Sequence, residues 1–267
     1  MPLKAGVYTN RKKDGSVSYR SSITFRSKHI SLGSYPSESE AHVAYCEAQK
    51  LLYSEDIAFD PAQYEQFISS FSTLSFSKCI ILYNFKTTGF YFKTPILLTD
   101  KYFLYFLTRT IVLKFDVDDL FYYSTHSISK RGGHLYVSDY GMQINILSKY
   151  GIKNFAVPGR DYRFINGDCY DFRYKNIEVI NKYYGVQKKL KNGQYVYDAV
   201  IHINGNYKIG SYKTEAEAAV AYNKAVNILK EKGIEKNYLT NYLIELDEIS
   251  YASLYHKIRI SKNIRDF

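Results

Sequence analysis

Leu32-Gly33-Ser34-Tyr35 and Ile209-Gly210-Ser211-Tyr212 are nearly the same tetrapeptide, and each stands at the same place in a repeated order of residues. Each tetrapeptide is preceded by a Gly-Val pair, at 6–7 and 185–186, and by alternating polar and apolar residues typical of strands. Each is followed by an alanine-rich stretch with helical spacing, at 41–52 and 218–229. From the tetrapeptide to the end of the helix the copies align without a gap. The chain is therefore built on a duplicated small module.

Each copy is expected to form a three-stranded antiparallel sheet with one helix. In the first copy, turn-like residues at 13–16 and 26–28 separate the strands. A capping box predicts each helix start, from Ser37 to Glu40 and from Thr214 to Glu217. Alanines then recur at spacings of three and four, which leaves one flat helix face that can lie close to a sheet.

Period-two alternation assigns the two faces of each sheet. The residues expected to point inward are Ser21, Ile23, Ile30 and Leu32 in the first copy, and Ala199, Ile201, Tyr207 and Ile209 in the second. The opposite face then carries hydroxyls, amides and cations. Such a face can enter the major groove of DNA, although a solvated face is the more ordinary role of outward strand residues.

The residues quoted above resemble the Apetala/ethylene-response-factor DNA-binding domain in both copies. That family packs one helix on a three-stranded sheet and reads double-stranded DNA through the sheet. The family usually has tryptophan and several arginines on its strands, whereas this chain has no Trp and its second copy has no Arg. The resemblance and the strand alternation together give the expected DNA contacts of the two copies: Tyr8, Asn10, Lys12, Arg20, Ser22, Thr24, His29, Ser31, Gln187, Lys189, Asp198, Val200, His202, Asn206 and Lys208.

A second pattern lies between the copies. Ile165-Asn166-Gly167-Asp168 predicts a turn between two strand-like pieces, and a short helix is expected to start within 170–176, with Asn176 holding the turn. This region resembles the HNH homing endonucleases of mobile elements. Where that family has a metal-binding Asp and a general-base His, this chain has Arg163 and Phe164.

Hydrolysis of a phosphodiester with one metal ion needs a base and ligands for the cation, and neither side chain supplies them. We therefore expect a degenerate nuclease region without metal or cofactor. Its basic residues would remain as phosphate contacts: Arg160, Arg163, Arg173 and Lys175. A rebuilt metal site is the alternative, and its possible ligands are His126, His134, Asp139, Asp161, Asp168 and Asp171. Carboxylates near a turn are more often caps.

The remaining segments carry weaker signals. Strands are expected near 79–83 and 111–115, and a helix at 239–254 precedes a tail that could pack on its own repeat or on a second chain. The predicted class is α+β, with two sheet-plus-helix modules flanking a degenerate ββα middle domain. The predicted segments are 1–56 (first module), 57–130 (aromatic-rich), 131–181 (HNH-like), 182–236 (second module) and 237–267 (tail).

Charge is concentrated in the copies. The chain of 267 residues has a formal net charge of +10. Residues 1–53 carry eight basic and four acidic side chains and residues 182–236 carry ten and five, whereas the other segments are nearly balanced. A polyanion such as nucleic acid is the partner that this distribution favours.

Other compositional features exclude some classes of protein. The three cysteines, Cys46, Cys79 and Cys169, are too few and too far apart for a disulfide framework or a four-cysteine zinc site. No apolar run is long enough for a membrane span, and the first residues lack the apolar core of a secretory signal. We therefore expect a cytoplasmic, nucleoid-associated protein with no membrane contact.

The sequence predicts a noncatalytic, sequence-specific binder of double-stranded DNA, a transcriptional regulator of a phage or other mobile element, acting as monomer or homodimer. An active HNH-type endonuclease is the first alternative. A protein-interaction or general nucleoid-binding module is the second.

Overall fold

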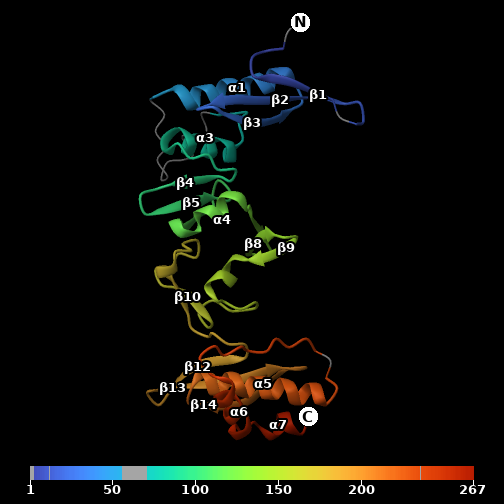
Figure 1. Cartoon of the computed structure of the whole chain (residues 1–267), viewed down its shortest axis with the longest axis vertical. Helices are drawn as coiled ribbons and strands as arrows, with labels where there is room; N and C mark the ends of the chain where they lie inside the picture. The colour runs from blue at the N-terminus through green and yellow to red at the C-terminus, as the bar shows by residue number, and fades with distance from the viewer. Residues whose placement is uncertain (1–2, 12, 56–70, 235) are drawn as a thin grey trace. The chain divides into compact units, whose positions relative to one another are not determined.

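The computed structural model describes residues 3–11, 13–55, 71–234 and 236–267. It is mixed α+β, as predicted, and divides into two compact units (Figure 1). Unit 1 comprises Met1–Gln143 with Cys169–Arg173, and unit 2 comprises Ile144–Asp168 with Tyr174–Phe267. One copy of the repeated module lies in each unit.

Both copies form the predicted sheet and helix. In unit 1 the strands pair antiparallel in the order β1 (Val7–Arg11), β2 (Val17–Phe25) and β3 (Lys28–Tyr35), and α1 (Glu38–Tyr53) follows. In unit 2 the equivalent elements are β12 (Val186–Lys191), β13 (Gln194–His202), β14 (Asn206–Tyr212) and α5 (Glu215–Glu231).

The glycine of each Gly-Val pair fits under a helix tyrosine. Gly6 has φ +74°, and a Cβ there would lie 2.1 Å from Cδ2 of Tyr45; at Gly185, φ is +69° and the distance to Tyr222 Cδ2 is 2.2 Å. Real Cβ contacts are never so short, and positive φ disfavours other residues. The first residue of each Gly-Val pair is therefore glycine because the chain passes directly beneath the helix at that point.

The same bulge interrupts both sheets. Ser21 pairs with Gly33 and Ser22 with Ser31, so Leu32 has no partner; Ile209 is skipped in the same way in the second sheet. A bulge inserts one extra residue and bends its strand. Both extra residues, Leu32 and Ile209, point inward as predicted and are buried.

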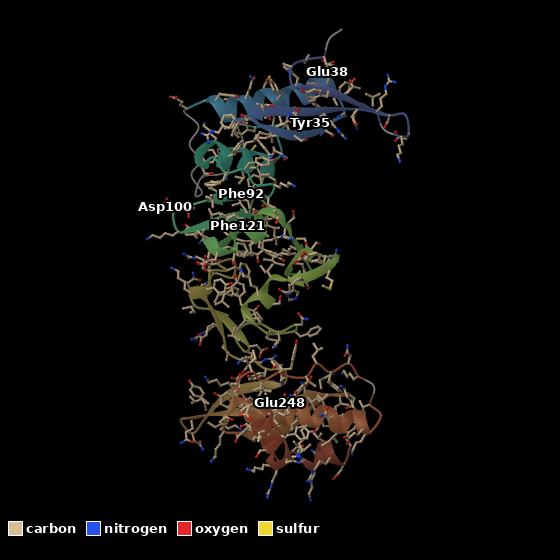
Figure 2. All side chains as sticks on the ribbon, in the orientation of Figure 1. Tyr35, Glu38, Phe92, Asp100, Phe121 and Glu248 are labelled. Carbon is tan, nitrogen blue, oxygen red and sulfur yellow. The ribbon has the colours of Figure 1, made fainter. Side chains whose placement is uncertain are left out.

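Both helices start at the predicted capping residue, but among the described residues the reciprocal bond of the predicted capping box forms at α5 and not at α1. Ser37 Oγ accepts the Glu40 N–H at 3.2 Å, and Glu38, at the β3–α1 junction in Figure 2, accepts the Lys4 N–H at 2.9 Å. In α5 the whole capping box forms: Thr214 Oγ1 accepts the Glu217 N–H at 3.2 Å and Glu217 accepts the Thr214 N–H at 3.1 Å. The predicted alanine faces are buried against the sheets.

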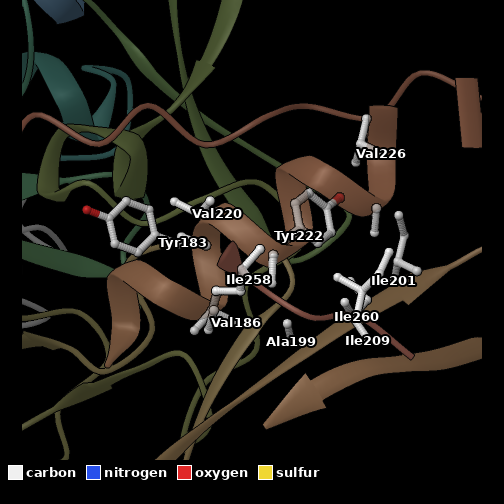
Figure 3. Packing of buried hydrophobic residues seen from close by; sticks show 14 of the residues in the cluster. Tyr183, Val186, Ala199, Ile201, Ile209, Val220, Tyr222, Val226, Ile258 and Ile260 are labelled. Carbon is white, nitrogen blue, oxygen red and sulfur yellow. The ribbon is translucent and has the colours of Figure 1, made fainter. Parts of the chain in front are cut away.

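Figure 3 shows the core of the second module, with Ala199, Ile201 and Ile209 of the sheet beneath Val220 and Val226 of α5. The C-terminal segment completes this core through Ile258, Ile260 and Ile264. The Ser261 N–H also donates to the Ile209 carbonyl at 2.8 Å. Of the two alternatives for the tail, packing on its own repeat is therefore confirmed.

The start of the predicted C-terminal helix is wrong. Helix α6 covers Glu248–Lys257 and begins where Asp247 caps the Ser250 N–H at 2.9 Å, and α7 covers Lys262–Arg265. Residues 239–247 are not helical. Asn223 of α5 holds the backbone of Asn241 there through hydrogen bonds of 2.7 and 2.8 Å.

The strand predicted at 79–83 is also wrong, because these residues lie in α3 (Phe76–Thr88), which packs on α1. A short apolar run does not distinguish a buried strand from a buried helix. The strand predicted at 111–115 is confirmed as β6 (Val112–Asp116), which forms a sheet with β4 (Ile96–Leu98) and β5 (Tyr102–Phe106). The 3-10 turn Val117–Asp119 and α4 (Leu120–Thr125) follow. Residues 57–70 of the predicted aromatic segment lie outside the described residues.

β7 (Ile128–Arg131) leads into the region 131–181. This region contains four further strands: β8 (His134–Asp139), β9 (Met142–Asn145), β10 (Tyr162–Phe164) and β11 (Ile177–Val179). β7 pairs with β8, and β10 pairs with β11. The predicted turn is confirmed: Asn176 accepts the Asn166 N–H at 2.8 Å and donates to the Asp168 carbonyl at 3.3 Å.

The helix expected within 170–176 is wrong. The chain makes only a 3-10 turn at Tyr174–Asn176, as it does earlier at Ile146–Tyr150. Residues before this turn instead run alongside β6: the Lys114 N–H donates to the Tyr170 carbonyl at 2.9 Å, and the Phe172 N–H donates to the Lys114 carbonyl at 2.8 Å. Extended pairing therefore replaces the helix.

Candidate nucleic-acid interface

The first candidate surface is the sheet face of the first module that α1 leaves uncovered, which we call face 1. Directly opposite residues of an antiparallel ladder share a face. The ladder places Tyr8 beside Arg20 and Arg20 beside Ser34. Arg20 is exposed, and within the described part of the chain its guanidinium makes no ion pair or hydrogen bond. The centre of face 1 is therefore an arginine free to bind a ligand.

The other predicted residues of face 1 surround Arg20 less uniformly. Thr24 and His29 are exposed and contact each other at 3.4 Å, and Ser31 is exposed. Asn10 is half-buried and donates to Ser18 Oγ at 3.3 Å. The predicted contact Lys12 lies outside the described residues.

The predicted exposure of Ser22 is wrong. It lies opposite Ser31 on the expected face but is only 8% exposed. It lines a hollow of about 250 Å³ that Tyr8 and His29 also line. Larger neighbouring side chains therefore cover a small hydroxyl that alternation alone would leave in water.

Face 2 is the corresponding sheet face of the second module, and its centre is acidic. The ladder places Gln187 beside Asp198 and Asp198 beside Ser211, in the positions that Tyr8, Arg20 and Ser34 have on face 1. Asp198 lies on the predicted face, but its predicted exposure is wrong, since it is 2% exposed.

Three lysines cover the Asp198 carboxylate and form with it a group that we call the Asp198 cluster. Lys189 and Lys208 place Nζ 3.0 Å from carboxylate oxygens, and Lys191 places Nζ 3.8 Å away. Ser211 Oγ donates a further bond of 2.5 Å. The lysine side chains are each about half exposed, so three cations against one carboxylate leave two positive charges facing solvent.

The cluster keeps Asp198 ionised. Burial by itself raises the pKa of the carboxyl, but the bonds from Ser211, Lys189 and Lys208 outweigh it and lower that pKa well below 3.8. The carboxylate therefore fixes the lysine ammonium groups at the centre of face 2.

The remaining predicted residues of face 2 are Gln187, which lies beside Asp198, and Val200, His202 and Asn206, which lie nearer the β13–β14 hairpin. His202 and Asn206 are exposed and contact each other at 3.0 Å, whereas Gln187 and Val200 are half-buried. These four residues line a hollow of about 320 Å³ together with residues 153–156 and Arg160. A loop of the region between the modules thus extends face 2.

The basic residues predicted between the modules differ in availability. Arg160 pairs with Asp161 at 2.7 Å and is half exposed, Arg163 pairs with Glu178 at 2.6 Å, and Lys175 is exposed. Arg173 pairs with the buried Asp171 at 2.5 Å and is only 20% exposed. Arg173 therefore stabilises unit 1 and does not belong to an exposed interface.

Two of the four carboxylates considered for a rebuilt metal site are held by arginines, Asp161 by Arg160 and Asp171 by Arg173. Within the described residues, no group of three His, Cys, Asp or Glu side chains is arranged to hold a metal ion. His126 instead lies 3.6 Å from Asp139 and stacks on Tyr122.

Several residues of the two candidate faces were not predicted from the sequence. Lys191 follows Gln187 and Lys189 at a spacing of two, so extending the alternation would have found it. Ser34 and Ser211 lie beyond the bulge, which shifts the pattern by one residue. Phe155 and Lys153 carry no sequence signal, because only the fold brings their loop to face 2.

No protein-family model, curated protein or solved structure matches this chain. In the described part of the chain, no helix combines the length and apolar character needed to cross a bilayer.

Proposed function

We propose that this protein is a noncatalytic, sequence-specific binder of double-stranded DNA, and that it acts as a transcriptional regulator through its two sheet faces. The observation that carries the proposal is the duplicated module with one helix-free, cation-bearing face in each copy. The charge excess of the chain lies in the same two copies.

The dimensions of the faces suit a duplex. Three strands about 4.8 Å apart span about 10 Å, and the major groove of B-DNA is about 12 Å wide. Arg20 on face 1 can donate two parallel hydrogen bonds to the O6 and N7 atoms of guanine, the commonest base-specific contact. The lysines of the Asp198 cluster suit phosphates, since an ammonium acts as a point charge.

The two faces therefore take different tasks. Face 1 reads sequence through Arg20, and face 2 supplies affinity through its lysines. Tethering makes the second contact intramolecular and raises affinity without new contacts.

Selection of binding sites from a random duplex pool, with magnesium present, tests the proposal. The expected result is an enriched, uncut motif. Failure to bind any duplex would refute DNA binding, and cut products would instead establish an endonuclease.

Variants then separate the two tasks. Arg20→Ala should weaken binding to the selected site by roughly 5- to 150-fold, because a bidentate base contact contributes about 1–3 kcal/mol. The affinity for other duplexes should change little. Arg11→Ala is the matched control, because Arg11 is exposed on the opposite face of the same sheet. Lys208→Ala should weaken binding to all duplexes alike and flatten the salt dependence by about one unit of slope.

A further inference from the structure

Phe155 has an unfavourable backbone conformation and an unfavourably exposed side chain. Its side chain is 96% exposed, and its backbone has φ +67°. A bulky residue at positive φ is strained, and an exposed phenyl ring gains nothing from burial. Strain of this kind that the surrounding structure maintains is a pointer to function.

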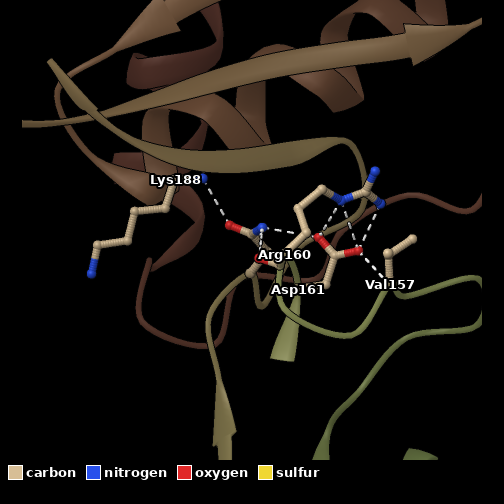
Figure 4. A network of polar contacts seen from close by, with 5 residues as sticks. Val157, Arg160, Asp161 and Lys188 are labelled. Carbon is tan, nitrogen blue, oxygen red and sulfur yellow. Dashed lines mark hydrogen bonds and ion pairs between the residues drawn. The ribbon is translucent and has the colours of Figure 1, made fainter. Parts of the chain in front are cut away.

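The loop that carries Phe155 is anchored. The carboxylate of Asp161 accepts the Val157 N–H at 2.8 Å and a side-chain N–H of Asn181 at 2.9 Å, in addition to its pair with Arg160 (Figure 4). Asn181 in turn accepts the N–H of Lys188 in β12 at 2.8 Å. The loop is therefore tied to the first strand of face 2.

The same loop adjoins the end of face 2. Phe155 and Lys153 line the hollow of about 320 Å³ together with Val200 and His202. Arg160, on the same loop, adds a second cation that is half exposed. A duplex lying on face 2 would thus meet the phenyl ring of Phe155 together with two cations of the same loop, Lys153 before it and Arg160 after it in the sequence.

We propose that Phe155 inserts between neighbouring base pairs of DNA bound to face 2 and kinks the duplex. The inference rests on the proposed function. Apolar side chains that enter a base step unstack it and bend DNA by about 20–90°. Pyrimidine–purine steps unstack most easily, so the inserted step is expected to be of that kind.

The test uses the full chain and a duplex that carries the selected site. Donor and acceptor dyes at the duplex ends report bending, and a fluorescent adenine analogue placed at each step in turn reports unstacking. The variants are Phe155→Ala, Phe155→Leu, and Phe121→Ala as the control, since Phe121 is also exposed, at 83%, but lies in α4.

Wild-type protein should bend the duplex and brighten the analogue at one step. Phe155→Ala should abolish both signals and weaken binding to the selected site by about tenfold, whereas Phe155→Leu retains part of each signal and Phe121→Ala retains both in full. Equal bending and fluorescence for Phe155→Ala and wild type would overturn the insertion while leaving DNA binding intact. If wild type bound no duplex, both proposals would fail.

Discussion

Replacing Asp198 by Asn removes the negative charge at the centre of face 2 and nearly preserves its volume. Removing one partner of a buried ion pair costs about 3–5 kcal/mol when the other charge stays buried. Here the lysine side chains are 47–50% exposed and can turn to water, and such pairs contribute at most about 1 kcal/mol each. The bond from Ser211 can pass to the amide oxygen. We therefore expect the free energy of unfolding to fall by about 1–2 kcal/mol.

The pH dependence of that loss has a definite sign. The folded pKa of Asp198 is lowered below 3.8, so its stabilisation is present above about pH 4 and disappears as the pH falls through the lowered value. Denaturant unfolding of wild type and Asp198→Asn should therefore differ near neutral pH and converge in acid.

Binding should change in the opposite direction. Without the carboxylate, the three lysines are free for phosphates, so affinity for any duplex should rise and the salt dependence should steepen by about one unit of slope. Because Arg20 is untouched and phosphate contacts do not depend on sequence, the ratio of specific to nonspecific affinity should stay nearly unchanged. Fluorescence anisotropy at several salt concentrations measures both quantities.

Glu231→Gln provides the matched control. It removes the same charge from the exposed end of α5, on the helix side of the sheet, and should leave the salt dependence nearly unchanged. Unchanged or weaker binding by a folded Asp198→Asn protein would show that the cluster does not face DNA.

Three further predictions concern the fold. Gly185→Ala should lower the free energy of unfolding by about 2–4 kcal/mol in denaturant titrations, because its Cβ would lie 2.2 Å from Tyr222. Gly193→Ala, at φ +76° with open space around it, should lower it by only about 1–2 kcal/mol, and equal losses would contradict the close-approach argument. Asn176→Ala should cost about 1–3 kcal/mol by the same titration, since it removes two hydrogen bonds that hold the 166–168 turn, at about 0.5–1.5 kcal/mol each, and an unchanged midpoint would exclude this role. In native protein a thiol reagent should label the exposed Cys46 and Cys169 but not Cys79, whose pKa burial raises to about 12; rapid labelling of all three would mean that the packing of α3 is wrong.

The fold of the two modules could be predicted because its determinants are local. Alternation along a strand, a capping residue and an alanine face each act over a few neighbouring residues, and each occurs twice. The predictions at 79–83 and at 239–247 failed for the opposite reason. Whether such a segment forms a helix depends on partners distant in sequence, α1 in one case and Asn223 in the other.

The candidate interface divides in the same way. Strand alternation by itself placed Arg20 and Asp198 on the outer faces, because the period of two is a property of the backbone. Only the tertiary structure decided that Arg20 is free while Asp198 is buried, since lysines on the two outer strands, β12 and β14, must meet over β13 before they can cover one carboxylate. It alone brought Phe155 beside face 2, through hydrogen bonds between a loop and a strand that the linear order of residues does not reveal.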